Sequence, residues 1–289
     1  MKGIILAGGK GTRLHPSTIA ISKQLLPVYD KPMIHYPLSI LMLAGIKEIL
    51  IVSSPEHLPL YQKLFENSYL LGIDIEYAVQ KEPNGIAEAF LIGEEFIDGE
   101  NVCLVLGDNI LYGSGLSGLL RQAALLQRGC TIFAYPVSDP ERYGVVEIDE
   151  NNKAIDIVEK PCNPKTNLAV PGIYFCDHSV VAKAKSLGKS NRGELEITDL
   201  NKLYLEEGSL NVSVFGRGIA WLDVGTHKAL LQAANYVNSI QELQGIQIAN
   251  LEEVAWHMGF ISDEELYDLA NCSYNKSQKE YLLDLLIER

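Results

Sequence analysis

Short apolar runs alternate with amphipathic stretches through the first half of the chain. The apolar runs predict strands over residues 2–8, 47–54, 74–80, 101–108 and 131–137. Between them, the spacing of apolar positions predicts helices over residues 32–45, 59–70, 86–97 and 115–127. This alternation is typical of an α/β protein whose mostly parallel sheet is covered by helices on both sides. In such sheets ligands bind at the carboxyl ends of the strands.

The pattern changes after about residue 138. Strands are predicted over residues 144–149, 153–161, 168–177, 210–215 and 219–225, with a hairpin turn at 149–152. Helices are predicted over residues 199–207 and 226–242, and then over 250–258, 262–270 and 276–288 with no strand between them. Because no Pro- or Gly-rich linker separates the halves, we expect the second half to continue the sheet of the first.

Charge limits the partners of this 289-residue chain. It has 24 Lys and Arg against 37 Asp and Glu, a formal net charge of −13, which argues against a broad nucleic-acid-binding surface. An anionic ligand would need a local pocket with a few focused cations. We expect no membrane partner, because no apolar run reaches the roughly 18 residues of a spanning helix. The short first run, followed by Lys10 and Arg13, predicts a cytoplasmic protein without a signal peptide.

The five cysteines and six histidines indicate no metal chemistry of their own. No C-x-x-C or H-x-x-x-H spacing occurs, so a zinc site is not expected. Cys103, Cys130 and Cys176 lie in apolar runs, and we expect them to be buried free thiols.

A glycine-rich turn follows the first predicted strand, in the segment Leu6-Ala7-Gly8-Gly9-Lys10-Gly11-Thr12-Arg13-Leu14. Glycines allow backbone N–H groups to approach phosphate oxygens closely. A Walker A loop is excluded because Lys10 is followed by Gly11, and a dinucleotide fingerprint because Leu14 stands at the third glycine position. A structural turn with solvated charges is the alternative. Lys23, within Ser22-Lys23-Gln24, adds another cation and favours a phosphate site.

Two carboxylates follow apolar strands. They are found in Leu106-Gly107-Asp108-Asn109 and in Trp221-Leu222-Asp223-Val224-Gly225. Because Mg²⁺ commonly takes one or two carboxylates together with substrate phosphates, Asp108 and Asp223 are candidate ligands. The alternative is that each caps a turn, and the sequence does not decide whether the two converge. Thr226 suits the N-cap of the helix that follows.

Two further segments carry cations next to carboxylates. Lys160 stands between Glu159 and Pro161 at the end of a predicted strand, where a surface edge is the alternative. Residues 192–199, RGELEITD, place Arg192 and a glycine before a helix. There the alternative is an ordinary helix start capped by Thr198 or Asp199.

Together these motifs resemble the sugar-1-phosphate nucleotidylyltransferase family. Residues 6–14 and 22–28 carry the general resemblance, and residues 29–34, 106–109, 192–199 and 221–223 are similar more narrowly to glucose-1-phosphate thymidylyltransferases. The resemblance covers nearly the whole chain. It implies the Rossmann-like nucleotide-diphospho-sugar transferase fold. It also implies a catalytic domain over residues 1–240 and a helical C-terminal segment over 241–289 that packs on it.

The resemblance also implies an activity. An enzyme of this kind forms dTDP-glucose and pyrophosphate from dTTP and α-D-glucose 1-phosphate with Mg²⁺, the first step toward dTDP-deoxysugars such as dTDP-L-rhamnose for polysaccharides. It further implies a homotetramer with an allosteric site for a dTDP-sugar feedback inhibitor, to which the C-terminal segment contributes. The alternatives are the same chemistry with UTP or another sugar 1-phosphate, or a non-catalytic nucleotide-sugar sensor. A sensor would be expected to lack Arg13, Asp108 or Asp223, and all three are present.

The site residues implied by the resemblance fall into four groups. The catalytic cations are Arg13, Lys23, Lys160 and Arg192, and the metal ligands are Asp108 and Asp223. The nucleotide-binding residues are Leu6, Gly8, Gly9, Gly11, Thr12, Arg13, Lys23, Gln24, Gln80, Gly85 and Ile86. The sugar-binding residues are Asn109, Gly144, Glu159, Lys160, Val170, Gly172, Tyr174 and Arg192.

Three segments depart from the wording typical of the family. Val224 stands where Thr usually follows the second metal carboxylate. The stretch expected as P-D-G-L-A-Q-A reads Pro83-Asn84-Gly85-Ile86-Ala87-Glu88-Ala89. The loop near residues 56–70 also differs. Val224, Asn84 and Ile86 bear on the rate and on the choice between dTTP and UTP.

Overall fold

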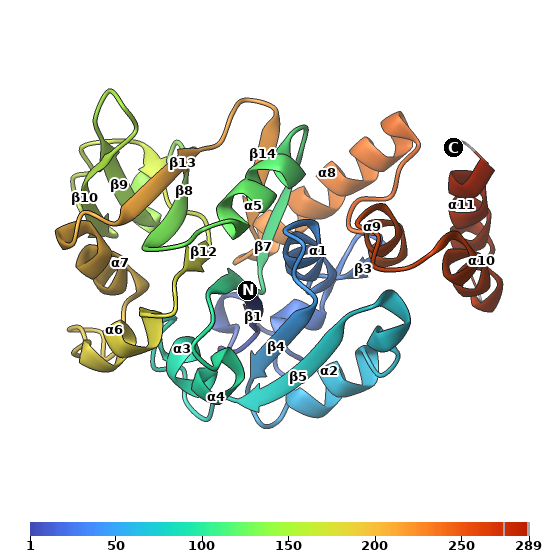
Figure 1. Ribbon diagram of the computed structural model, residues 1–289, viewed down its shortest axis with the longest axis horizontal. Helices are drawn as coiled ribbons and strands as arrows, with labels where there is room; N and C mark the ends of the chain where they lie inside the picture. The colour runs from blue at the N-terminus through green and yellow to red at the C-terminus, as the bar shows by residue number, and fades with distance from the viewer. Residues whose placement is uncertain (274, 288–289) are drawn as a thin grey trace.

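The computed structural model describes residues 1–273 and 275–287. A twisted mixed β-sheet runs through the molecule, with helices on both faces (Figure 1). Among the described residues it has ten strands, in the order β10-β9-β11-β8-β12-β6-β1-β4-β5, with β13 paired to β8 beside this path. One half is parallel: β1 (Lys2–Leu6) lies between β4 (Glu48–Ser53) and β6 (Val102–Leu106), and β5 (Asp74–Val79) follows β4.

Strands from the second half of the chain extend the same sheet. They are β8 (Cys130–Pro136), β9 (Gly144–Ile148), β10 (Ala154–Glu159), β11 (Leu168–Ala169), β12 (Ile173–Cys176) and β13 (Leu210–Val214). Strand β12 pairs antiparallel with both β6 and β8, so it joins the two halves. The expected continuation of the sheet and the predicted fold class are confirmed, as is the hairpin between β9 and β10.

The helices bury the apolar side chains of both sheet faces. Ile5 of β1 belongs to the core under α1 (His35–Leu43), α5 (Leu116–Ala124) and α9 (Leu251–His257). Its neighbour Ile4 belongs to the core on the other face, under α3 (Glu88–Ile92), α4 (Glu94–Ile97), α6 (Val180–Ser186) and α7 (Ile197–Glu206). Because successive side chains of a strand point to opposite faces, a strand buried on both sides has consecutive apolar residues, as β1 has at Ile4 and Ile5.

A third apolar cluster connects the long helix α8 (His227–Gln244) to two small hairpin-like sheets. One sheet pairs β2 (Pro27–Val28) with β3 (Lys31–Pro32), and the other pairs β7 (Asn109–Gly113) with β14 (Ile219–Asp223). Thr226 caps α8 as predicted, because its hydroxyl accepts a hydrogen bond from the Ala229 N–H at 3.2 Å.

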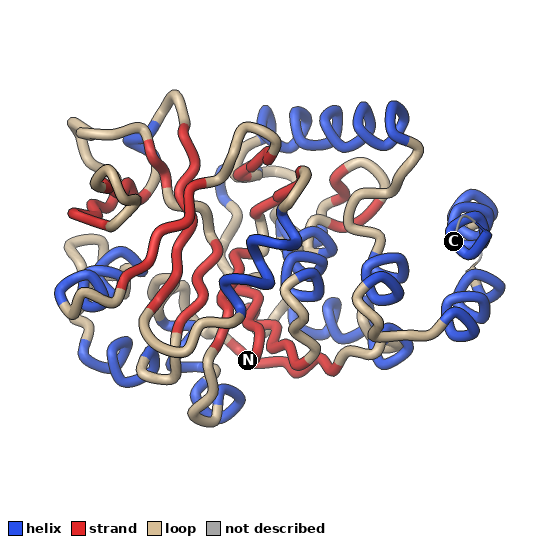
Figure 2. Tube along the Cα trace, turned by 45° about the horizontal axis from the view of Figure 1, so that its top comes forward, coloured by secondary structure: helices blue, strands red, loops and turns tan. Residues whose placement is uncertain are grey.

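The C-terminal helices lie at one end of the molecule, far from β9 and β10 (Figures 1 and 2). Helix α9 packs on α1, and α10 (Asp263–Cys272) packs on α9 and α11 (Lys276–Ile287). The predicted helix over 276–288 is confirmed up to residue 287, since residue 288 lies outside the described residues. In the described part of the chain, no helix has the length and apolar character needed to cross a membrane. Cys103, Cys130 and Cys176 are buried free thiols, as predicted.

Several predicted elements differ from the structure. The helix predicted over 86–97 is divided at Gly93, and the one over 59–70 consists of α2 (Leu58–Leu64) and a 3-10 turn, Ser68–Leu71. The strand predicted over 168–177 is interrupted at residues 170–172, between β11 and β12. Strand β7 and helix α6 were not predicted, because each is a short apolar run enclosed by turns and gives no clear periodicity.

A buried carboxylate ties the end of β12 to its neighbours. Asp177 is 4% exposed, and its Oδ2 accepts a hydrogen bond from the Gly129 N–H at 2.6 Å. Its Oδ1 accepts hydrogen bonds from the Ser179 N–H at 3.0 Å and from the Tyr204 hydroxyl of α7 at 3.1 Å. The Ser179 hydroxyl also donates to Oδ1, at 2.5 Å. Burial disfavours the charged form, but the hydrogen bond from the Ser179 hydroxyl and the others together outweigh burial, so the pKa of Asp177 lies below its ordinary value.

We predict that Asp177→Asn destabilises the protein by about 2 kcal/mol, because one acceptor oxygen becomes a donor that faces other donors. Thermal unfolding at pH 7 should then show a Tm lower by about 4–8 °C. A carboxyl whose pKa is lowered by folding stabilises the folded protein fully at pH values above its ordinary pKa of about 4. This stabilisation is lost as the pH falls through the lower pKa that the carboxyl has in the folded protein. The Tm difference between the two proteins should therefore narrow below about pH 4. A difference that is constant down to pH 3 would contradict this.

Candidate active site

The candidate site lies where the parallel strands end. The register that pairs Leu6 of β1 with Leu106 of β6 places the turn after β1 beside the turn after β6. The Gly107 N–H donates to the Leu6 carbonyl at 2.9 Å, which fixes the two turns side by side. Gly8 and Asp108 therefore meet at one edge of the sheet, as the sequence predicted for polar residues that follow strands.

The small sheet of β7 and β14 brings the second carboxylate to the same place. Asp223, the last residue of β14, pairs with Asn109, the first residue of β7. The Val224 N–H also donates to the Asp108 carbonyl at 3.0 Å. Two carboxylates that are 115 positions apart in the sequence (223 minus 108) thus belong to one site. The sequence left this convergence open.

The two carboxylates shape each other's charge. The side chains of Asp108 and Asp223 are only 13% and 19% exposed. Burial, followed by repulsion from Asp108, raises the pKa of Asp223. Burial also disfavours the charged form of Asp108, but the Lys23 ammonium that hydrogen-bonds to it outweighs this and lowers its pKa. The two carboxylates therefore repel each other, and their charge depends on the cations around them.

Three cations surround this pair. Lys23 forms an ion pair with Asp108, and the Arg142 guanidinium lies 3.7 Å from the Asp223 Oδ2. The Arg13 side chain crosses Gly225, where an added Cβ would lie 3.0 Å from its guanidinium nitrogen. These cations give an acidic protein the local positive pocket that an anionic ligand would need.

The donor set fits a hard divalent cation. In the described part of the chain, no three His, Cys, Asp or Glu side chains gather into a metal-binding cluster. Asp108 and Asp223 can thus supply two carboxylates and leave other coordination positions to a ligand and to water. Mg²⁺ binds in this way, through one or two carboxylates together with phosphate oxygens.

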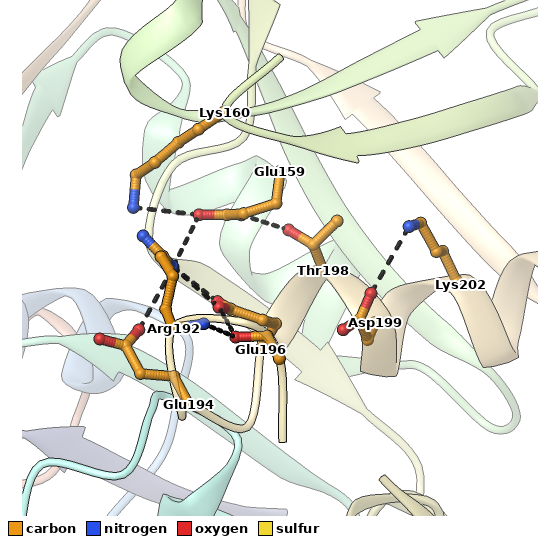
Figure 3. Close-up of polar contacts among 9 residues, drawn as sticks. Glu159, Lys160, Arg192, Glu194, Glu196, Thr198, Asp199 and Lys202 are labelled. Atoms are coloured by element: carbon orange, nitrogen blue, oxygen red, sulfur yellow. Dashed lines mark hydrogen bonds and ion pairs between the residues drawn. The ribbon is translucent and has the colours of Figure 1, made fainter. Parts of the chain in front are cut away.

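A second group of charged residues lies at the antiparallel half of the sheet (Figure 3). Glu159 ends β10, and the ammonium of Lys160 lies 3.1 Å from its Oε1. Lys160 has a φ of 43°, which is unusual for a residue other than glycine. Such backbone conformations are found most often at functional sites, where the surrounding structure holds them in place.

Arg192 is held by a fork of hydrogen bonds. Its Nε donates to the Glu196 Oε1 at 3.0 Å, and its terminal nitrogen donates to the Glu196 Oε2 at 2.7 Å. The same nitrogen lies 3.2 Å from Glu194 and 3.5 Å from Glu159 (Figure 3). The hydrogen bonds with Glu196, its largest influence, raise the pKa of Arg192. Arg192 thus reaches the site through carboxylates that fix its orientation.

Thr198 has a different role from the helix cap that its local sequence suggested. It lies inside α7, and the residue before this helix, Glu196, caps it with no side-chain hydrogen bond. The Thr198 hydroxyl instead donates to the Glu159 Oε2 at 2.5 Å. Asp199 pairs with Lys202 at 3.5 Å and does not cap the helix either. Thr198 therefore orients a carboxylate that lies 39 residues earlier in the chain.

Both groups line one cavity of about 550 Å³. It brings together most of the predicted site residues, namely Leu6, Gly8, Arg13, Lys23, Gln24, Ile86, Asp108, Asn109, Gly144, Glu159, Lys160, Val170, Gly172, Tyr174 and Asp223. Asn109 bridges its two sides, because its Oδ1 accepts hydrogen bonds from the Trp221 indole at 2.6 Å and from the Gly172 N–H at 3.1 Å.

The other predicted residues, within the described ranges, stand just outside this lining. Gly9, Gly11 and Thr12 continue the glycine turn, Gly85 precedes Ile86, Gln80 packs against Gly8, and Arg192 bonds to Glu159. The lining also contains residues that the sequence did not identify as site residues, among them Arg142, Tyr143, Thr198, Asn201 and Trp221. A signal for Arg142 existed in the sequence, since it is a cation in the polar segment between the strands predicted over 131–137 and 144–149.

A backbone contact joins the two sides of the cavity. The Leu195 N–H donates to the Asn84 carbonyl at 2.6 Å, and the Ala87 N–H donates to the Leu195 carbonyl at 3.2 Å. We call this pair of hydrogen bonds, between residues 84–87 and Leu195, the backbone clamp. Gly85 permits it, because its φ is +112° and an added Cβ would lie 2.4 Å from the Leu195 carbonyl oxygen.

Comparison with known proteins shows which proteins this chain is similar to. Residues 2–240 match a family model described as nucleotidyl transferase. The chain is 56% identical to a glucose-1-phosphate thymidylyltransferase of Neisseria meningitidis, over 99% of each chain. It is 50% identical to one of Mycolicibacterium smegmatis, again over 99% of each. A solved structure of UDP-glucose pyrophosphorylase complexed with UDP-glucose shares the fold, with a TM-score of 0.71 and 26% identity over 82% of this chain and 98% of that one.

We predict that Gly85→Ala destabilises the protein by about 3 kcal/mol, because the new Cβ meets the Leu195 backbone in a conformation that L-residues avoid. Gly99→Ala is the matched control. Its φ is also positive, at +71°, but no atom lies within 4 Å of the added Cβ, so only about 1 kcal/mol should be lost. Calorimetric unfolding of both variants would measure the difference. Equal losses of unfolding free energy in the two variants would show that the backbone of Leu195 leaves room for a side chain at position 85.

Proposed function

The chain belongs to the nucleotidyl transferase family, and we propose that it forms dTDP-glucose and pyrophosphate from dTTP and α-D-glucose 1-phosphate. One observation carries the proposal: the glycine turn, two carboxylates and their cations face Glu159 and Lys160 across a single cavity. This is the arrangement required to hold a nucleoside triphosphate and a sugar phosphate at once. The relatives with the same printed activity are 50% and 56% identical over nearly their whole length.

The chemistry is a substitution at the α-phosphorus of the nucleotide. A phosphate oxygen of glucose 1-phosphate forms a new bond to this phosphorus, and the bond to the bridging oxygen of pyrophosphate breaks. Such reactions depend on positioning and charge neutralisation more than on covalent help from the protein. The backbone N–H groups of residues 8–12 would bind the triphosphate, and Arg13 and Lys23 would balance the charge that develops on the leaving pyrophosphate.

Asp108 and Asp223 would hold Mg²⁺ against the phosphates. A bound Mg²⁺ would supply charge neutralisation and a fixed geometry for the phosphate oxygens. A bound cation would favour the charged form of Asp223, against the burial and the repulsion from Asp108 that raise its pKa. Lys23, already paired with Asp108, would be near enough to contact the same phosphates.

The antiparallel half of the cavity would bind the sugar phosphate. Lys160 and Arg192 would contact its phosphate, and the Glu159 carboxylate would accept hydrogen bonds from sugar hydroxyls. Gly144, Val170 and Gly172 would offer backbone groups, with Asn109 and Tyr174 beside them. Gln24, Gln80, Gly85 and Ile86 would contact the base and ribose. The homotetramer, the feedback site for a dTDP-sugar and the residue 240 boundary stay predictions.

The second candidate is the same chemistry with UTP. The relatives at 50% and 56% identity do not favour it. It is kept because the fold is shared with UDP-glucose pyrophosphorylase and because Asn84, Ile86 and Val224 depart from the wording typical of thymidylyltransferases. Thymine and uracil share the same hydrogen-bonding edge. Discrimination between them therefore depends on contacts with the ribose and with the 5-methyl group.

Pyrophosphate release, measured with Mg²⁺, glucose 1-phosphate and each of dTTP, UTP, CTP, GTP and ATP, tests the assignment. We expect the highest kcat/KM with dTTP. Asp108→Asn and Arg13→Ala should each lower it by at least about 100-fold, because each removes charge stabilisation from the transition state. Asp74→Asn, at the exposed opposite end of β5, is the control and should be neutral.

The same assay identifies the alternatives. Release with UTP alone would keep the chemistry and overturn the base assignment. Tight binding of a nucleotide sugar, with no release from any of the five nucleotides, would support the sensor.

Thr198→Val tests the sugar side separately. The variant keeps the size of the side chain but removes the hydrogen bond that orients Glu159, so the KM for glucose 1-phosphate should rise about tenfold. The KM for dTTP should stay within about twofold. Thr166→Val removes another hydroxyl of the same half of the sheet, one bonded to the Val146 carbonyl, and should leave both constants unchanged. An equal rise in both KM values for Thr198→Val would indicate a general distortion instead.

A further inference from the structure

A chain of side-chain hydrogen bonds begins behind the proposed nucleotide pocket. Gln80 follows β5 and is 5% exposed. Its amide Oε1 faces Gly8, since a Cβ added to Gly8 would lie 2.5 Å from this oxygen. Gly8 itself lines the cavity. The other end of the amide, Nε2, donates to the Glu88 Oε2 at 2.7 Å.

Glu88 connects Gln80 to a second amide and then to a cation. Its Oε1 accepts a hydrogen bond from the Asn84 Nδ2 at 2.8 Å. The Asn84 Oδ1 in turn accepts one from the Lys189 ammonium at 3.1 Å. We call Lys189, Asn84, Glu88 and Gln80 the amide relay.

The charged members of the relay decide which way the amides point. A carboxylate only accepts hydrogen bonds and an ammonium only donates them, whereas an amide can turn and exchange its oxygen and nitrogen. Lys189 therefore requires the oxygen of Asn84, and Glu88 requires the nitrogen of both Asn84 and Gln80. As a result Gln80 can present only its oxygen, an acceptor, toward Gly8.

A second glutamine next to Gly8 is oriented the opposite way. The Gln24 Oε1 accepts a hydrogen bond from the Ser22 hydroxyl at 2.6 Å, and this hydroxyl accepts one from the Tyr61 hydroxyl at 2.8 Å. The Gln24 Nε2 lies on the Gly8 side, 3.4 Å from the Gly8 carbonyl. Around Gly8 the protein thus offers one donor group and one acceptor group.

We propose that Glu88 is a positioning residue that sets the nucleobase specificity of this protein. By holding the Gln80 nitrogen, it presents the Gln80 oxygen to a base that carries an imide N–H next to a carbonyl, as thymine and uracil do. Cytosine carries an unprotonated ring nitrogen at that position, so it would set two acceptors against each other. The inference rests on the proposed function, because it assumes that the base lies against Gly8.

Glu88→Gln tests the relay with little change in size. One acceptor becomes a donor. Because Lys189 keeps the Asn84 nitrogen directed at position 88, the new amide is expected to turn its oxygen toward Asn84 and its nitrogen toward Gln80, which then turns its own nitrogen toward the base. The most direct comparison is between dUTP and dCTP, which differ only in the edge that Gln80 would face. We expect the ratio of their kcat/KM values to fall about tenfold, while the KM for glucose 1-phosphate stays unchanged.

A compensating second substitution separates orientation from simple damage. In the double variant Glu88→Gln with Asn84→Asp, the new carboxylate at position 84 can accept from both Lys189 and the new amide nitrogen at position 88. The remaining amide oxygen at position 88 can then hold the Gln80 nitrogen again. The dUTP to dCTP ratio should return to within about threefold of the original value. Glu95→Gln, an exposed carboxylate on α4, is the charge-matched control and should not change the ratio.

The outcomes distinguish the two proposals. If the unaltered protein releases no pyrophosphate with dTTP, UTP or dUTP, the proposed function fails. If it uses dTTP and rejects dCTP, but Glu88→Gln leaves the dUTP to dCTP ratio within twofold, the proposed function stands and the role of Glu88 is overturned. Failure of the double variant to restore a lowered ratio, with both variants unfolding at the temperature of the unaltered protein, would equally overturn it.

Discussion

Two carboxylates that lie close together in a largely buried place repel each other. The residues around them are arranged so that this repulsion is offset. Asp108 and Asp223 are brought together by the pairing of β7 with β14, and each is left only slightly exposed. Lys23, Arg13 and Arg142 surround them and offset this charge. A bound divalent cation would relieve the repulsion further and leave the cations of the protein to balance the charge of phosphates. Protein cations and a bound metal therefore converge on the same few ångströms, which allows a chain of net charge −13 to handle a triphosphate.

The pattern of apolar and polar positions predicted the elements whose burial is visible in their own sequence. The central residues of β1, β4 and β6 are buried on both faces, so these strands carry consecutive apolar residues and were recognised. The sequence also predicted β14, but not β7, which gives no clear periodicity. It could not show that the two strands pair, because they are more than 100 residues apart. The convergence of the two carboxylates, which depends on that pairing, was therefore beyond the sequence.

The site residues also fall into two groups: those that the sequence predicts and those that only the fold reveals. The glycine turn and the strand-end carboxylates were identified from their position after apolar runs, and the cavity brings most of them together. Thr198 and Glu88 were not identified, because each acts through one partner that only the fold supplies. For Thr198 the local rule suggested a helix cap, while its hydroxyl in fact reaches Glu159. In this site, the residues that follow strands left a pattern in the sequence, whereas Thr198 and Glu88, which orient other side chains, did not.

The backbone clamp between residues 84–87 and Leu195 has a mechanical consequence. It ties the loop of residues 84–87 to the loop that carries Arg192 through two main-chain hydrogen bonds. Main-chain hydrogen bonds involve no side-chain atoms. A displacement of one loop is therefore expected to move the other, so the two ends of the cavity respond as one unit.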